Sequence, residues 1–164
     1  MSRNKLKKEL QQFTRGQLLQ LILDAYAARK EFKTYFDYFL NPDPEALFRD
    51  VSETVRKECA RQKRNFSKLR VSVLKRCLED FASYHPGDDY IQDLRLFIIS
   101  EMLGVSSRFH TTDVQLRTFA FFVSAYVKAA DEYGNLSEAV ARLRELHARE
   151  VGARSFRPLL QVWE

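Results

Sequence analysis

The chain has 164 residues, of which 45% are hydrophobic, and a net charge of +5. A chain of this length can bury a core without a disulfide or a metal, and its five glycines and four prolines are too few for the frequent turns of an all-β protein. The charge is uneven, because residues 1–82 hold 18 lysines and arginines against 11 acidic residues, whereas residues 83–164 hold 9 against 11. We therefore expect an all-α fold with its basic excess in the first half.

The first three expected helices are followed by a turn that contains two prolines. The apolar spacing predicts a short helix over residues 5–13 and a second one from the Thr14-x-x-Gln17 capping box to about residue 29, with an apolar face broad enough for burial on more than one side. After a kink near Lys30, an aromatic stripe predicts a helix over residues 31–40. The stripe consists of Phe32, Tyr35, Phe36, Phe39 and Leu40. Asn41-Pro42 ends this helix, and Asp43-Pro44 caps the next, which extends to about residue 62.

The later helices are longer and more apolar. The polar residues 61–66 indicate a connection between helices. Asn65 or Ser67 is the expected cap of the next helix, which extends to about residue 83. Residues 84–88 form a break, and Asp88 is the expected cap of the helix that follows. Two long helices are predicted over 90–107 and 113–133, and a Thr-x-x-Gln capping box opens the second. Both are expected near the centre of the protein. Gly134 ends the second, and Ser137 caps a last helix to about residue 151. The predicted architecture is a single-domain multi-helix bundle of residues 1–164. Helical hairpins stacked in a solenoid-like array fit equally well, and an apolar tail, 153–164, follows the last helix.

Three segments resemble a known family. They are Leu6-Lys7-Lys8-Glu9-Leu10, Thr14-Arg15-Gly16-Gln17-Leu18 and Tyr35-Phe36-Asp37-Tyr38-Phe39-Leu40-Asn41-Pro42. This opening is similar to that of an uncharacterised family of small, all-helical bacterial proteins, known only as a domain of unknown function. The resemblance covers about the first third of the chain and implies a helical fold and a bacterial, cytoplasmic setting. It implies no activity for any residue.

Few residues suggest catalysis or the binding of a metal or phosphate. His85, His110 and His147 lie in separate segments without the spacing of a metal-binding helix, and there is no glycine-rich phosphate loop. Cys59 and Cys77 are isolated, which predicts reduced thiols of a cytoplasmic protein. No export signal is visible, and the most apolar run, residues 119–127, is about half of a membrane span. We expect no catalytic activity, no cofactor, no metal and no membrane contact.

Two surfaces remain as candidate sites. The basic segment 56–76 suggests contact with an anion or a nucleic acid, although a solvated basic face is the more common role of such a segment. Its candidate contacts are Arg56, Lys57, Arg61, Lys63, Arg64, Lys68 and Arg70. In the tail, Phe156, Leu160 and Trp163 are of the types enriched at interfaces, although docking onto the bundle is the simpler expectation. The sequence therefore favours a non-catalytic helical protein-interaction module, with another protein as partner; sequence-independent binding of nucleic acid or another polyanion is the alternative.

Overall fold

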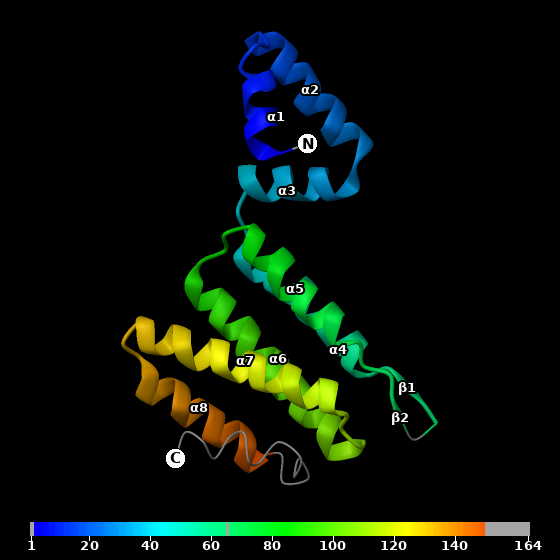
Figure 1. The fold of residues 1–164 in the computed structure, drawn as a ribbon, viewed down its shortest axis with the longest axis vertical. Coiled ribbons are helices and arrows are strands. Elements are labelled where there is room, and N and C mark those ends of the chain that lie inside the picture. The colour runs from blue at the N-terminus through cyan, green and yellow to red at the C-terminus, as the bar shows by residue number, and fades with distance from the viewer. Residues whose placement is uncertain (1, 65, 150–164) are drawn as a thin grey trace. The chain divides into compact units, whose positions relative to one another are not determined.

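A computed structural model describes residues 2–64 and 66–149 of the chain (Figure 1). These residues form eight helices and one ribbon of two short strands, which confirms the all-α, multi-helix fold. The apolar tail, with Phe156, Leu160 and Trp163, lies outside the described residues. The chain divides into two compact units, Met1–Pro42 and Asp43–Glu164. That residues 1–164 act as a single domain stays a prediction.

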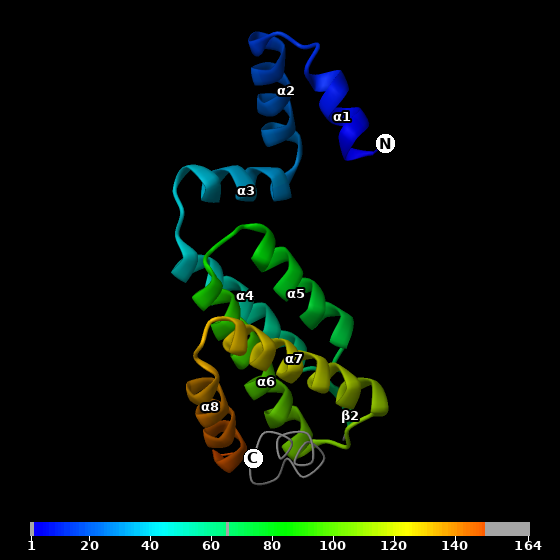
Figure 2. The same cartoon turned by 60° about the vertical axis from the view of Figure 1, so that its left-hand side comes forward.

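The first unit contains α1 (Arg3–Leu10), α2 (Arg15–Ala28) and α3 (Lys30–Leu40). The predicted capping box opens α2, since the backbone N–H of Gln17 donates to Thr14 Oγ1 at 3.2 Å and that of Thr14 donates to Gln17 Oε1 at 2.9 Å. Arg29 is extended, so the chain breaks between α2 and α3 instead of kinking. α3 then runs across the end of α2 (Figure 2), and the Tyr26 hydroxyl donates to Asp37 at 2.6 Å, which ties the two helices together.

The helices of the first unit are unusually exposed. The expectation that α2 is buried on more than one side is wrong, because none of its residues is buried and Leu19 is 58% exposed. No residue of α1 or α3 is buried either. Among the described residues, fourteen large hydrophobic side chains are exposed, and nine of them belong to this unit: Leu6, Phe13, Leu19, Leu21, Ile22, Leu23, Tyr35, Phe39 and Leu40.

The second unit is a bundle around one long helix. Its elements are α4 (Pro44–Cys59), β1 (Gln62–Lys63), β2 (Phe66–Ser67), α5 (Val71–Ser83), α6 (Asp88–Arg108), α7 (Asp113–Glu132) and α8 (Leu136–Arg149). α6 packs against α4, α5, α7 and α8. In a solenoid each repeat contacts only its neighbours, so these contacts favour the bundle over the array of hairpins.

The core of the second unit lies mainly on α6 and α7. Leu94, Ile98, Ile99, Met102 and Leu103 of α6 are buried, and so are Phe119, Phe122, Val123, Tyr126 and Val127 of α7. This confirms the prediction that these two helices are central. Burial of each such side chain contributes about 1.5–3 kcal/mol, and the side chains of α6 and α7 make up most of the buried apolar core.

Helix ends agree with the sequence where a local motif encodes them. Thr112 and Gln115 form the second capping box. Gly134, with a φ of 74°, lies at the end of α7, where the N–H of Asn135 donates to the Ala130 carbonyl at 2.9 Å in a Schellman motif.

Three predicted caps are wrong. α5 begins at Val71 after Arg70, without a side-chain cap, so neither Asn65 nor Ser67 caps it. Asp88 is the first residue of α6, whose N-cap is Gly87, and Ser137 lies inside α8.

Candidate functional site

The segment between α4 and α5 is a β-hairpin instead of a plain polar connection. β1 and β2 pair antiparallel, with Gln62 opposite Ser67 and Lys63 opposite Phe66. The N–H of Lys68 donates to the Arg61 carbonyl at 2.9 Å and adds a third pair to the ladder. At the tip, Arg64 has a φ of 55°, the left-handed conformation that tight hairpin turns require. In Figure 1 the hairpin extends beyond the ends of α4 and α5.

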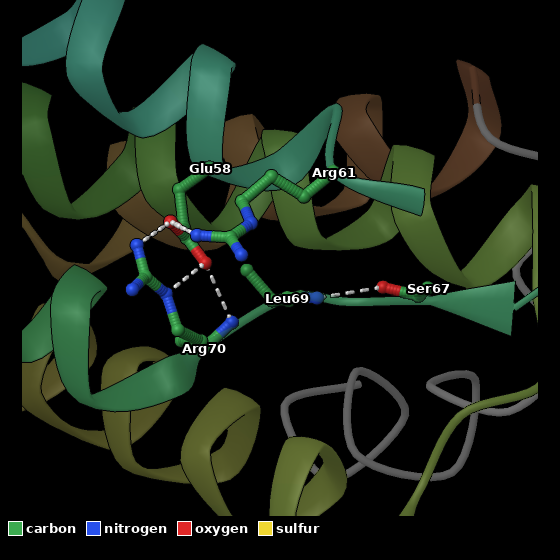
Figure 3. Close-up of polar contacts among 5 residues, drawn as sticks. All are labelled: Glu58, Arg61, Ser67, Leu69 and Arg70. Carbon is green, nitrogen blue, oxygen red and sulfur yellow. Dashed lines mark hydrogen bonds and ion pairs between the residues drawn. The ribbon is translucent and has the colours of Figure 1, made fainter. Parts of the chain in front are cut away.

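A buried carboxylate holds the base of the hairpin. The side chain of Glu58, in the last turn of α4, is only 5% exposed. One of its oxygens accepts the backbone N–H of Arg70 at 2.9 Å and the Arg70 Nε–H at 3.0 Å, and the other accepts Arg70 Nη2 at 2.7 Å. Arg61 Nη1 lies 3.4 Å from the second oxygen, so the carboxylate stands between two arginines (Figure 3).

These contacts set the protonation of Glu58. The hydrogen bonds from Arg70 lower the pKa of the Glu58 carboxyl, and this effect outweighs burial, which raises it. The same contacts raise the pKa of Arg70. Glu58 is therefore ionised at neutral pH. Its charge binds Arg70, the residue before α5, to the end of α4 and so closes the base of the hairpin. No sequence motif marks Glu58 for this position.

Four of the seven predicted anion-contact residues have carboxylate partners. Arg61 and Arg70 share Glu58, Lys57 is 2.7 Å from Glu53, and Arg56 is 3.7 Å from Glu101 and lies over the ring of Phe97 at 5.0 Å. The other three are Lys63, Arg64 and Lys68, which are all exposed. Within residues 2–64 and 66–149, no carboxylate lies within ion-pair distance of these three side chains. Among the described residues, the candidate cations without a carboxylate partner therefore lie on or beside the hairpin.

The hairpin that carries the three cations also carries one exposed aromatic ring. Phe66 is 68% exposed on β2, directly opposite Lys63. Successive pairs of a ladder alternate between the two faces of the ribbon, so the Lys63–Phe66 pair and the Arg61–Lys68 pair lie on the same face. We call this face, with Lys63, Phe66 and Lys68, the ribbon face. Arg64 stands at its end.

A second candidate site is a groove within the first unit. It has a volume of about 830 Å³, lies between α1 and α2 and is lined by Arg3, Asn4, Leu6, Lys7, Leu10, Gln11 and Leu18. Its apolar lining comes from three leucines, and two cations lie beside them. α1 carries four basic residues and one acidic residue, Glu9, so the groove is apolar inside and positively charged around it.

A third concavity, of about 230 Å³, lies where α6, α7 and α8 meet. Arg142 lines it and pairs with Glu138 at 2.7 Å and with Asp93 at 3.5 Å. Burial raises the pKa of Tyr126 at the same place. Because Arg142 already neutralises two of the lining carboxylates, we assign this cavity a structural role in joining α8 to the bundle.

The other titratable candidates are dispersed along the chain. His85 and His110 lie in the connections before and after α6, and His147 lies on α8. Burial raises the pKa of the Cys59 thiol to about 12 and raises that of Cys77 as well. In the part of the chain that the structure describes, no group of three or more His, Cys, Asp or Glu side chains could hold a metal ion. None of the helices described there is both long and apolar enough to cross a membrane.

One of three comparisons with known proteins bears on the resemblance seen in the sequence. A search of curated proteins and a search of solved structures found no match to this chain. A family model described as "Family of unknown function (DUF6155)" matches residues 1–150, well beyond the opening third that carries the resemblance. The chain therefore belongs to this uncharacterised family.

Proposed function

We propose that the protein is a non-catalytic helical interaction module and that its first unit binds another protein. The observation that carries this proposal is the concentration of exposed apolar side chains in α1, α2 and α3. Monomeric proteins rarely expose apolar patches of more than a few hundred Å² unless they use them. Each of the nine large side chains is at least 38% exposed, and Leu19, Phe39 and Leu40 are each more than half exposed.

The α1–α2 groove indicates what kind of partner the unit accepts. Leu6, Leu10 and Leu18 line it at positions that an apolar helix face can contact, and amphipathic helices commonly dock in this way. Arg3 and Lys7 lie beside the leucines and favour a partner with acidic flanks. The proposed partner is therefore a protein that supplies an amphipathic helix with a leucine-rich face and acidic residues beside it. A bacterial, cytoplasmic setting is part of the same proposal.

A charge exchange tests this proposal on the full-length chain. Two labelled helical peptides of about five turns share one leucine-rich face, and one carries glutamates and the other lysines on its remaining positions. In fluorescence anisotropy the protein should bind the acidic peptide more tightly, by roughly 2- to 30-fold for two exposed ion pairs. Arg3→Glu with Lys7→Glu should invert the preference. Lys5→Glu with Lys8→Glu is the matched control, because these lysines are on α1 but do not line the groove.

Three results would contradict the proposal. The first is no binding of either peptide up to about 100 µM, the weak end of specific recognition. The second is equal affinity of the wild type and the Arg3/Lys7 variant for the acidic peptide. The third is a concentration-dependent dimer in light scattering that Leu6→Gln abolishes, since a second copy of the chain would then occupy the groove.

A further inference from the structure

We propose that the ribbon face binds single-stranded nucleic acid, with Phe66 stacking on a base and Lys63, Arg64 and Lys68 contacting the phosphates beside it. This surface shares no residue with the groove of the first unit, and the inference does not depend on the proposed protein partner. It also replaces the broad basic platform of residues 56–76 with a smaller and more specific surface.

The first step of the argument is the distribution of charge. Arg56, Lys57, Arg61 and Arg70 are paired with carboxylates, so their positive charge is already partly neutralised within the chain. Lys63, Arg64 and Lys68 have no such partner among the described residues, and all three lie on or beside one hairpin. Cations grouped in this way attract a chain of phosphates and release its counterions.

The second step is the position of Phe66. One exposed ring on a protein surface is ordinary, but this ring lies directly across the ladder from Lys63 and on the same face as Lys68. Every base has a flat π-face, and an aromatic ring flanked by cations is the arrangement that single-strand binders use. A double helix keeps its bases stacked inside and offers nothing to the ring, so the aromatic residue favours a single strand over a duplex.

The third step is rigidity. A ribbon with strands of two residues is too short to be stable by itself. Here Glu58 fixes its base through the three hydrogen bonds from Arg70, and the Ser67 hydroxyl accepts the N–H of Leu69 at 3.2 Å. A hairpin backbone that is held in place before binding loses less conformational entropy when the hairpin binds a ligand.

The test measures the anisotropy of a labelled, mixed-sequence single strand and of its duplex, with the full-length protein at about 50 mM salt, where weak electrostatic binding is still detectable. The wild type should bind the single strand more tightly than the duplex. Phe66→Ala should lower affinity for the single strand by about 5- to 150-fold, the loss of one stacking contact, and should leave duplex binding nearly unchanged.

A charge variant tests the phosphate contacts. Lys63→Gln, Arg64→Gln and Lys68→Gln together should lower affinity and reduce the log–log salt slope by about 2, given roughly 0.7 per phosphate contact on a single strand. The matched control removes three exposed cations elsewhere in the second unit, with Arg49→Gln, Lys128→Gln and Arg144→Gln, and should keep most of the affinity.

Several outcomes would overturn the inference. A wild type that binds neither probe refutes it, and so does a Phe66→Ala variant that binds the single strand as tightly as the wild type, because the ring then has no part in recognition. Equal losses in the triple variant and its control would mean that binding depends on net charge alone. Circular dichroism on each variant checks that the fold is retained; these side chains are exposed, so we expect no change.

Discussion

Glu58→Gln should destabilise the second unit, although it only replaces one carboxylate oxygen by an NH2 group and removes the negative charge. The glutamine can keep its oxygen on the Arg70 N–H and Nε–H, but its amide group then faces Arg70 Nη2, which donates to Glu58 at 2.7 Å in the wild type. A hydrogen bond to a charged group contributes about 1.5–3 kcal/mol. The lost bond is replaced partly by water at Arg70, while the two remaining bonds lose the charge of their acceptor. We expect a loss of about 2–3 kcal/mol in the free energy of unfolding.

Thermal unfolding followed by circular dichroism measures this change. For a chain of this size, Tm should fall by about 4 to 12 °C. Glu53→Gln is the control, because Glu53 pairs with Lys57 at a similar 2.7 Å but both side chains are exposed; its effect should be close to the measurement error. Amide hydrogen exchange should also show faster exchange at the Lys68 N–H in the Glu58 variant, since the clamp that closes the hairpin is weakened.

The pH dependence gives a second readout of the same contact. The pKa of Glu58 in the folded protein lies below its ordinary value of 4.5, so the carboxylate contributes its full stabilisation above about pH 4.5 and loses it as the pH falls through the folded-state pKa. The difference in stability between the wild type and Glu58→Gln should therefore be constant near neutral pH and shrink in acid. If Glu58→Gln were as stable as Glu53→Gln at pH 7, the carboxylate could not be the anchor of the hairpin.

Three further predictions concern the core, a helix end and a thiol. Phe81→Ala should lower stability by about 3–5 kcal/mol, because Phe81 is completely buried and its removal leaves a cavity; urea unfolding would show it, and a loss below about 1 kcal/mol would contradict the packing. Gly134→Ala should cost about 1 kcal/mol through its φ of 74° alone, because a Cβ there would meet no atom within 4 Å; Gly134→Asn should cost less in the same assay. Cys59 should resist a disulfide reagent at pH 8 until the protein unfolds, because its thiol is buried with a pKa of about 12; rapid labelling of both cysteines in native protein would refute this.

The helices could be predicted from the sequence because their signals are local. Thr14 with Gln17, Thr112 with Gln115, and Gly134 each fix a helix end through bonds to residues within a few positions. The apolar spacing of α6 and α7 likewise identified the centre of the bundle. The exposure of Leu19 on α2 could not be predicted in this way, since an apolar stripe indicates which side chains can be buried and not whether another element covers them.

The candidate site was predicted only in part, for the same reason. The basic segment was visible as composition, but the pairing of Arg70 with Glu58 joins residues twelve positions apart and depends on the hairpin between them. Strands of two residues leave no alternating pattern to detect. One signal was available: Glu58 adjoins Cys59 on the buried side of α4, where Val55 also lies. A lone acid on a buried stripe, beside many cations, must find a partner among them.

The Glu58 clamp also determines where the chain can change in length. It acts as a noncovalent cross-link between the end of α4 and the start of α5. The residues between positions 58 and 70 therefore form a closed loop, and the contacts that fix the two ends of this loop do not involve its tip. The entropy of closing such a loop grows slowly, and doubling its length costs only about 0.6 kcal/mol. Extra residues at the hairpin tip should therefore leave the bundle folded. An epitope or a fluorescent tag can therefore be grafted at the tip without unfolding the helices that carry it.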